Sequence, residues 1–583
     1  MKKNKIMLIV FLLLLLCFLG VTSCTKEPDQ GSGSGSGDKT TYTITYELNG
    51  GTCEILPLEY SSLESLVLPI PEKDYYAFMG WYDNPNFDGT KIEIIQKGTS
   101  GNKTYYAKFV PMFKHNSINF DGNGAKFVIK VLPLSEYDPF DDQYTYPDKS
   151  IKQAIQKSVE TSYNIKIEYS EWEDEAPFGI ERINYIKRSF IDGSFLNKNI
   201  YAINIDTTFI MNLVKASCLA EIYNETTEEE LITDYYNSLN NIEKDLLVNN
   251  NKLYGISNGY NAENFIIYNK TKVEQYGLTD PAELWYQGMW TWDTYDEWVK
   301  SASSKLLDDE KVISISPYDY IIGKRHSFGD SIINKVRYKL NNPTEIKNIF
   351  QEITSYQEQG IYDKQAILTS LSNDFINNKS LMASGSLYNL SYLFSNYENE
   401  VDCEIGIVPY PYNSEETISF YYEPYDFTDG YGNKISVDKI IKDRNGEVLK
   451  IDDKEIYGIN FTNSTYKTPV KSSSCFAVMN YNNAPISKKA AAHIMNDLLN
   501  TNSKLSEVEM ILESLPINEF DKRILLSLQN QNLHNYEPLE AIDTYMMDNI
   551  NSHYVSWYSV CYDILNNEKN IDECVNIYKQ QLG

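Results

Sequence analysis

The chain has 583 residues, of which 42% are hydrophobic and 13% aromatic, so it is too long for one hydrophobic core and apolar enough for several folded domains. Its 52 basic and 81 acidic residues give a formal net charge of −29. Because binding to a phosphate backbone needs clustered lysine and arginine, this balance argues against nucleic acid as a partner.

The chain begins with an export signal. Three lysines within the first five residues precede an apolar run, Ile6 to Val21, that is too short for a comfortable transmembrane helix. The ending Val21-Thr22-Ser23-Cys24 resembles a bacterial lipobox, which implies a signal peptide at 1–23 and lipid modification of Cys24. The alternative is an ordinary secretory signal with an incidental cysteine. The lipobox reading places the protein on the extracytoplasmic face of the cell membrane.

Residues 24–40 include a Gly/Ser repeat at 31–37. Such a composition behaves as a flexible coil, so we expect a tether that holds the folded part away from the membrane. The other six cysteines are widely spaced and the five histidines show no ligand-like spacing. We therefore predict neither a metal site nor a cofactor.

Residues 41–110 are predicted to form a small β module. An alternating strand, Tyr42 to Leu48, runs into the turn Asn49-Gly50-Gly51, and the aromatic segments Tyr76 to Tyr82 and Thr104 to Phe109 follow. These segments resemble the Listeria–Bacteroides B-repeat, a β-grasp-like module of bacterial surface proteins. We expect Trp81 to lie in its core and the module to act as a spacer, with adhesion as the alternative.

The main body, residues 111–583, opens with strands that alternate with helices. The expected strands are Phe127–Leu132, Ile165–Tyr169 and Ile200–Ile205, with helices from Ser150 and over 181–191. This order predicts βαβ units and a mainly parallel sheet. Ligands of such sheets bind beyond the carboxyl ends of the strands. The candidate binding residues at those ends are Trp172, Asp206 and Thr208.

The stretch from Leu253 to Lys300 contains a predicted strand and the start signals of three helices. Phe265 to Tyr268 is a compact apolar run that predicts a buried strand. Helices are expected to begin at Thr271, at Asp280 with Pro281 in the first position, and at Thr291. The helical spacing of the tryptophans assigns them to packing: Trp290, Trp292 and Trp298.

Four short motifs follow one another in this stretch: Tyr254-Gly255-Ile256-Ser257, Tyr268-Asn269-Lys270, Tyr276-Gly277-Leu278 and Trp290-Thr291-Trp292-Asp293. Their order resembles the extracellular solute-binding proteins, family 1, the receptors of carbohydrate ABC importers. Thr294 departs from the pattern, because the family usually has a carboxylate there. The resemblance extends over residues of about 125 to 583 through further motifs: Asp374 to Ser386, Ile405 to Pro411, Cys475 to Val478 and Ser487 to His493.

The resemblance implies an α/β, two-lobed, periplasmic-binding-protein-like (type II) fold with a hinge, in addition to the N-terminal β-grasp-like module. The first lobe would comprise about 125–256 and 476–525, and the second about 262–470 and 535–583. The chain would cross between lobes near 255–264, 473–476 and 520–540. A polar β-rich insertion at about 412–470 has no assigned role. The implied function is that of a monomeric receptor that captures a carbohydrate and delivers it to ABC permease subunits.

A sugar site needs an aromatic platform together with fixed polar partners. The family often places a tryptophan after the Gly-Ser of a GSW motif, and here Leu387 stands there, so Gly385 and Tyr388 are the candidates from this motif. Further aromatic candidates are Trp172, Tyr260, Tyr412 and Trp557. The polar candidates are Asp206, Thr208 and Glu263.

Two other functional classes stay open. Glycoside hydrolysis needs only two carboxylates, but the sequence has no GxSxG, HExxH or phosphate-cradling glycine loop, so we predict that the protein is not an enzyme. A peptide receptor is the nearest alternative to a carbohydrate receptor. A cell-surface adhesion protein that acts through the B-repeat is the other. The sequence does not name the sugar, its linkage or its length.

Overall fold

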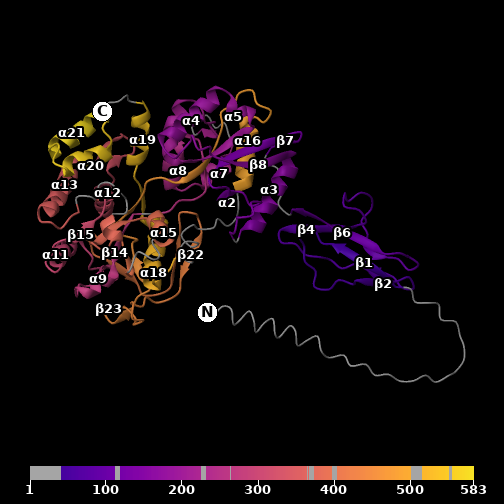
Figure 1. Cartoon of the computed structure of the whole chain (residues 1–583), viewed down its shortest axis with the longest axis horizontal. Coiled ribbons are helices and arrows are strands. Elements are labelled where there is room, and N and C mark those ends of the chain that lie inside the picture. The colour runs from indigo at the N-terminus through magenta and orange to yellow at the C-terminus, as the bar shows by residue number, and fades with distance from the viewer. Residues whose placement is uncertain are drawn as a thin grey trace, which may run out of the picture. The chain divides into compact units, whose positions relative to one another are not determined.

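A computed structural model describes the chain at residues 41–111, 118–146, 148–224, 232–262, 264–363, 366, 373–396, 403–499, 512, 515–549 and 554–582. These residues form two compact units that divide between Val110 and Pro111 (Figure 1). The predicted signal peptide, Cys24 and the tether lie outside the described residues. Within the part that is described, no helix combines the length and the apolar run needed to cross a membrane.

The first unit is a β module whose main sheet has the strand order β2-β1-β6-β4, with β1 parallel to β6 and antiparallel to β2. Trp81 fills its centre: the indole Nε1 donates to the Pro69 carbonyl at 2.7 Å, and the ring lies 5.0 Å from the ring of Tyr46. The expected β module with Trp81 inside is confirmed. Its strands are β1 (Thr41–Glu47), β2 (Glu59–Ser61), β3 (Leu66–Val67), β4 (Tyr76–Tyr82), β5 (Ile94–Ile95) and β6 (Lys103–Pro111).

The first lobe of the second unit is built on a five-stranded sheet of order β13-β27-β9-β7-β8. β7 is parallel to β8 and to β9, which confirms the predicted βαβ units. β27 is antiparallel to β9, and the chain reaches it only after it has passed through the second lobe. The strands are β7 (Ala125–Val131), β8 (Ile165–Glu171), β9 (Ile200–Asp206), β13 (Ile256–Ser257) and β27 (Ser474–Val478).

Amphipathic helices pack against this sheet. In α3, for example, Ile155, Val159 and Tyr163 are buried at a spacing of four residues, so they lie on one face. The helices are α2 (Leu134–Tyr137), α3 (Lys149–Tyr163), α4 (Ile180–Ile191), α5 (Ser194–Asn197), η1 (Thr207–Phe209), α6 (Ile210–Lys215), α7 (Thr233–Ser238), α8 (Asn241–Leu247) and α16 (Lys488–Leu499). A small sheet joins β10 (Tyr223–Asn224), β12 (Lys252–Leu253) and β11 (Val248–Asn249).

The second lobe contains a four-stranded sheet of order β15-β18-β14-β19. Only β15 and β18 are parallel, and β14 is antiparallel to both of its neighbours. The predicted mainly parallel sheet, which concerned the strands of the first lobe, has no counterpart here, where β14 arrives directly from the hinge instead of from a βα crossover. The strands are β14 (Phe265–Asn269), β15 (Lys311–Ser314), β18 (Ser380–Gly385) and β19 (Ile405–Val408).

The helices of the second lobe begin largely where the sequence predicts. Asp280 and Thr291 accept hydrogen bonds from Ala282 N and Thr294 N as N-caps of α10 and α11. The first cap differs: Asn269, not Thr271, accepts from Lys272 N and starts α9. The helices are α9 (Lys270–Gln275), α10 (Pro281–Tyr286), α11 (Trp292–Ser303), α12 (Pro317–Ser327), α13 (Pro343–Glu358), α14 (Asn373–Ile376), α15 (Leu387–Asn396), α18 (Glu519–Leu528), α19 (Leu539–Asn549), α20 (Trp557–Leu565) and α21 (Ile571–Gln581).

The hinge joins the two lobes. Residues 258–264 lead from β13 to β14, and β26 (Thr468–Val470) leads back toward β27 and pairs in parallel with β28 (His534–Tyr536). The third crossing is not at 520–540 as expected. Phe520 and Ile524 of α18 pack in the core of the second lobe, while α16 packs in that of the first, so residues 520–525 do not belong to the first lobe.

The segment between β19 and β26, predicted as an insertion, is β-rich as expected and packs in the core of the second lobe. It contains two hairpins, β21–β22 and β23–β24, and the antiparallel pair β20–β25, which encloses them. The predicted turn signals at Asp429-Gly430 and Asn445-Gly446 fall between paired strands or bridged segments. The strands are β20 (Ser419–Tyr421), β21 (Tyr425–Thr428), β22 (Lys434–Val437), β23 (Lys450–Ile451), β24 (Lys454–Glu455) and β25 (Gly458–Asn460). A further pair, β16 (Ile333–Asn334) and β17 (Lys339–Leu340), lies before α13.

Candidate functional site

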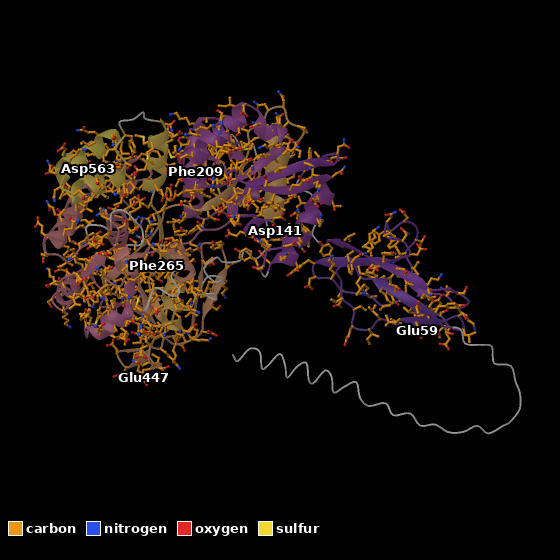
Figure 2. All side chains as sticks on the ribbon, in the orientation of Figure 1. Glu59, Asp141, Phe209, Phe265, Glu447 and Asp563 are labelled. Carbon is orange, nitrogen blue, oxygen red and sulfur yellow. The ribbon has the colours of Figure 1, made fainter. Side chains whose placement is uncertain are left out.

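The two sheets present their loop-bearing edges to the hinge. In the first lobe, β7 and β9 are parallel and end at the same edge, and β13 ends there before the first crossing. In the second lobe, β14 starts at the corresponding edge, where β18 ends. Phe209, three residues beyond β9, and Phe265, the first residue of β14, mark the two edges in Figure 2. Groups at these edges are the candidates for a ligand site.

Asp206 is the last residue of β9 and organises the edge of the first lobe. Its Oδ1 accepts hydrogen bonds from Thr208 N at 2.8 Å and from Thr208 Oγ1 at 2.6 Å. Burial raises the pKa of Asp206 above the ordinary aspartate range, and the hydrogen bonds from Thr208 oppose this rise. The sequence prediction that Asp206 and Thr208 lie together at a strand end is therefore matched by the geometry.

The second crossing is bonded to this edge. Thr207 N donates to the Ser473 carbonyl at 2.9 Å, and Ser473 N donates to Thr207 Oγ1 at 3.1 Å. Next to them, Asn204 Nδ2 donates to Ser474 Oγ at 2.7 Å. The hydroxyl of Tyr137 lies 3.5 Å from the same Ser474 oxygen. Hydroxyl, amide and carboxylate groups from three separate segments thus converge at the hinge end of the first lobe.

The second lobe contributes charged groups to the same region. Lys471 forms an ion pair with Asp319 at 3.0 Å and lies 5.5 Å above the ring of Tyr318. Burial raises the pKa of Glu540 on α19; Asp206 and Asp319 raise it further, and Lys471 opposes them. Asp206 of the first lobe, Asp319 of the second and Lys471 of the hinge thus all affect the carboxyl of Glu540, so these four groups lie within electrostatic range of one another.

The helix that carries Glu540 bridges the lobes. Leu539 and Ile542 of α19 are buried in the core of the second lobe. On the first lobe, Asn212 in α6 donates through Nδ2 to the Thr544 carbonyl at 3.2 Å and accepts through Oδ1 from Asn549 Nδ2 at 2.7 Å. The position of Glu540 therefore depends on how the two lobes are arranged.

Exposed aromatic rings occur at both edges. Tyr388, 69% exposed, lies at the start of α15 directly after β18, and its ring stacks on that of Tyr392 with centroids 6.0 Å apart and planes 19° apart. On the first lobe, Phe178 is 63% exposed, lies 5.2 Å from the ring of Phe209, and has the Arg182 guanidinium 5.7 Å from its centroid. Sequence reasoning missed Phe178 and Tyr392; the signal for Phe178 was its place in the loop after β8.

Two other aromatic candidates are seated in the first-lobe core. Trp172 packs 6.4 Å from the ring of Phe195, under the guanidinium of Arg182. Tyr260 is 2% exposed and meets the ring of His534 edge-on at 5.4 Å. Both lie beside the candidate site, but neither presents an open face in this arrangement of the lobes.

The remaining candidates are reassigned to packing. Tyr412 has no exposed surface and stacks on Trp285 at 4.0 Å, and Trp557 is equally buried beside Tyr578. A Cβ added to Gly385 would lie 2.3 Å from the ring of Phe265, so this glycine allows two strands to approach. Glu263 lies outside the described residues. A side chain without exposed surface cannot stack on a sugar in this arrangement.

Among the residues that are described, no group of three or more His, Cys, Asp or Glu side chains is arranged to hold a metal ion.

Comparison with known families identifies the first unit. Residues 42–108 match the Listeria-Bacteroides repeat domain. The expected resemblance at 41–110 is therefore confirmed, and we call this unit the repeat. One curated relative, a putative Gly-rich membrane protein of Evansella cellulosilytica, is 27% identical over 143 residues. This match covers 23% of the present chain and 16% of the relative, so the chain spans only a small part of that protein's length.

Two solved structures to which this chain is similar are described as binding proteins for cyclic sugars or for ABC import. ABC substrate-binding protein Lmo0181 from Listeria monocytogenes, in complex with cycloalternan, is 12% identical with a TM-score of 0.46, over 79% of this chain and 98% of that one. The cyclic alpha-maltosyl-1,6-maltose binding protein of Arthrobacter globiformis is 11% identical with a TM-score of 0.48, over 79% and 97% of the chains.

Proposed function

We propose that the protein is a lipid-anchored, extracytoplasmic substrate-binding protein of an ABC importer, which captures a carbohydrate between its two lobes and delivers it to a permease. The observation that carries this proposal is the exposed stacked pair of Tyr388 and Tyr392 at a sheet edge that faces the hinge. The ordered motifs at residues 254–293 support it, because they resemble carbohydrate receptors.

The chemistry of the site suits a sugar. The apolar face of a pyranose ring packs on an aromatic ring, and its hydroxyls need acceptors and donors held in place. Asp206 and Glu540 supply carboxylate acceptors, and Lys471 supplies a donor at the hinge. Rotation of the lobes about the hinge would enclose a ligand between these groups and the aromatic rings. No step in this proposal requires catalysis.

A titration of the full chain tests this proposal. The melting temperature is measured against a panel of tetrasaccharides, with maltotetraose, cellotetraose and xylotetraose as probes and tetraalanine as the peptide control. A ligand that binds only the folded state increases the free energy of unfolding, by about 2.7 kcal/mol when its concentration is a hundred times Kd. The melting temperature rises as a result. A shift with tetraalanine and with none of the sugars would favour the peptide receptor instead.

Tyr388→Ala addresses the aromatic platform. Loss of a stacking ring is expected to weaken binding of the active sugar by roughly 2- to 13-fold, which corresponds to about 0.5–1.5 kcal/mol. Tyr558→Ala is the matched control, because Tyr558 is also exposed but lies on α20. Equal affinity of the Tyr388→Ala protein and the wild type would remove this residue from the site.

The anchor and the repeat are tested separately. Palmitate labelling of cells that express the wild type or Cys24→Ala should mark only the wild type, and equal labelling would refute lipidation. Deletion of residues 41–110 should leave sugar binding unchanged if the repeat is a spacer. Loss of binding on this deletion would assign the working surface to the repeat.

A further inference from the structure

The hairpin β21–β22 of the insertion contacts the first hinge crossing. Tyr260 N donates to the Gly430 carbonyl at 3.3 Å, and Asn261 Nδ2 donates to the Tyr431 hydroxyl at 3.1 Å. Two consecutive residues of the crossing are therefore bonded to the tip of a hairpin that lies about 170 positions later in the chain.

Two glycines allow this contact. A Cβ added to Gly430 would lie 2.1 Å from the Tyr260 carbonyl oxygen, and one added to Gly259 would lie 2.1 Å from the ring of Tyr431. Gly259 also has a φ of +95°, a conformation that side chains rarely adopt. Each surface thus carries a glycine where the other approaches, so the fit between tip and hinge depends on both positions.

The tip is rigid by itself. Asp429, 1% exposed, accepts through Oδ1 from Tyr431 N at 2.9 Å and from Asn433 N at 2.7 Å. Its own N–H donates to the Asn433 carbonyl at 3.0 Å. A buried carboxylate that accepts from several backbone N–H groups fixes the conformation of the loop by itself. The loop therefore loses little conformational entropy when it packs against the hinge.

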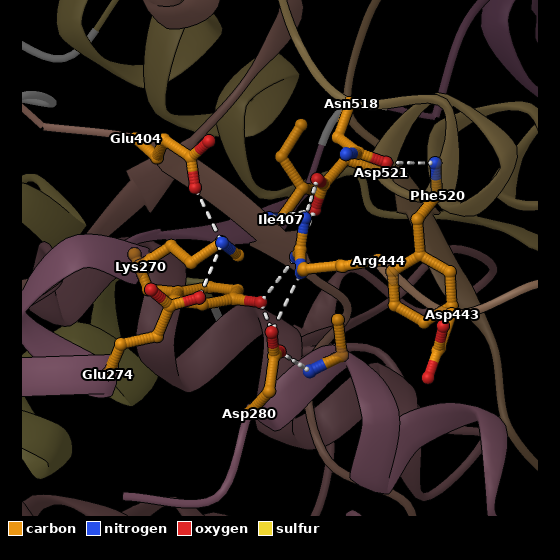
Figure 3. Close-up of polar contacts among 12 residues, drawn as sticks. Lys270, Glu274, Asp280, Glu404, Ile407, Asp443, Arg444, Asn518, Phe520 and Asp521 are labelled. Atoms are coloured by element: carbon orange, nitrogen blue, oxygen red, sulfur yellow. Dashed lines mark hydrogen bonds and ion pairs between the residues drawn. The ribbon is translucent and has the colours of Figure 1, made fainter. Parts of the chain in front are cut away.

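Arg444, in the turn between the bridged residues Lys442 and Val448, joins the insertion to the second lobe (Figure 3). Arg444 donates to both carboxylate oxygens of Asp521 on α18, through Nε to Asp280 at 2.7 Å, and through Nη2 to the Tyr268 hydroxyl at 2.7 Å. Arg523 on α18 adds bonds to the backbone carbonyls of the insertion, including Ile440 O at 2.7 Å. The insertion therefore moves with the second lobe.

Tyr260 is held from both sides. Its ring belongs to the core of the first lobe, where the hydroxyl lies 3.5 Å from Oδ1 of Asn240, the N-cap of α8. Its backbone is bonded to the hairpin tip. Two residues later, Ala262 N donates to Gln529 Oε1 at 3.1 Å and its carbonyl accepts from Gln529 Nε2 at 3.2 Å. The crossing is thus tied to the second lobe from Tyr260 onward.

We propose that the hairpin β21–β22 is a hinge brake, which ties Tyr260 and Asn261 to the second lobe, confines bending of the first crossing to residues 258–259, and resists changes in the angle between the lobes. Gly259 is the residue that absorbs the rotation, since it precedes the segment bonded to the second lobe and its N–H donates to Ser257 Oγ, within the crossing itself, at 3.0 Å. The brake acts on the hinge whether or not a ligand is bound. Its effect on ligand affinity rests on the proposed function.

Hydrogen–deuterium exchange of the full chain without ligand tests the brake. Tyr431→Phe removes the hydroxyl that accepts from Asn261, and Gly430→Ala pushes the tip away from the Tyr260 carbonyl. In both proteins, exchange of peptides that cover 256–264 should rise by roughly 3- to 10-fold, while exchange in the repeat stays unchanged. Tyr422→Phe is the matched control, because Tyr422 is an exposed tyrosine of the same insertion.

Unchanged exchange at 256–264 in Tyr431→Phe would overturn the proposal, and so would an equal rise in Tyr422→Phe. If Gly430→Ala does not fold, Tyr431→Phe alone decides. Because this measurement uses no ligand, its failure is distinct from failure of the proposed function. A second titration with maltotetraose then compares the Kd of wild type and Tyr431→Phe: a changed Kd extends the brake to binding, and an unchanged Kd overturns that extension.

Discussion

Substitution of Arg444 by methionine tests how the insertion is held. The guanidinium bonds to Asp521, which is fully buried, and to Asp280, which is nearly so. Removal of one partner of a buried ion pair leaves an uncompensated charge and costs about 3–5 kcal/mol. With an unfolding entropy of about 2.1 cal/mol/K per residue, a body of more than 450 residues should lose about 3–5 °C in melting temperature. Calorimetry of the full chain measures this loss.

The pH dependence of this loss tests its cause. Burial raises the pKa of Asp521, and Arg444 opposes this rise. Without Arg444, the folded-state pKa lies further above the unfolded value, so protonation stabilises the folded variant as the pH falls. The stability gap between the Arg444→Met protein and the wild type should therefore be smaller at pH 5 than at pH 8.

Lys450→Met is the control for this experiment, because Lys450 is an exposed residue of the same insertion. It should change the melting temperature by less than about 1 °C at either pH. A gap that is the same at pH 5 and pH 8 would refute the uncompensated carboxylate as its origin and point to lost packing against Phe520, whose ring lies 5.2 Å from the guanidinium carbon.

Two further predictions concern other parts of the molecule. Burial lowers the pKa of His534 from 6.5 to about 4. Between these pH values the unfolded chain binds more protons than the folded one, so stability falls by about 3 kcal/mol as the pH drops through them. His534→Gln should flatten this fall in a series of melting curves at different pH, and an unchanged slope would contradict the prediction. Trp81→Ala should destabilise the repeat by about 3–5 kcal/mol and abolish its calorimetric transition, while the transition of the second unit stays in place; a shift of both transitions would show that the units do not unfold independently.

Elements with a strong local pattern were predictable from the sequence. The run Phe265–Tyr268 became β14, and the alternation of strands and helices before residue 206 became the parallel part of the first sheet. The cap of α9 was misplaced by two residues, because Asn269 competes with Thr271 for the same role. Thr271 instead accepts a hydrogen bond from Glu404 N, a contact 133 positions away that no local pattern reveals.

Side-chain exposure was much less predictable. Tyr388 and Tyr412 are the same residue type in similarly loose motifs, yet one is open and the other is buried against Trp285. That difference depends on contacts between segments more than 100 positions apart. The assignment of residues 520–525 to the first lobe was wrong for a related reason. The amphipathic pattern of α18 suits either lobe, whereas its actual contacts are with the second-lobe core and, through Asp521, with Arg444, 77 positions away in the sequence.

The ion pairs of Arg444 with Asp280 and Asp521 give the insertion a sequence signature that can be recognised in other chains. An insertion between two strands is commonly gained or lost without change in the surrounding domain, but here two acidic residues of the parent lobe face into it. A relative without residues of the 419–460 segment would leave Asp280 and Asp521 without their cation, so we expect such a relative to carry neutral or apolar residues at both positions. The three positions should therefore vary as a set, and this covariation offers a way to date the acquisition of the insertion.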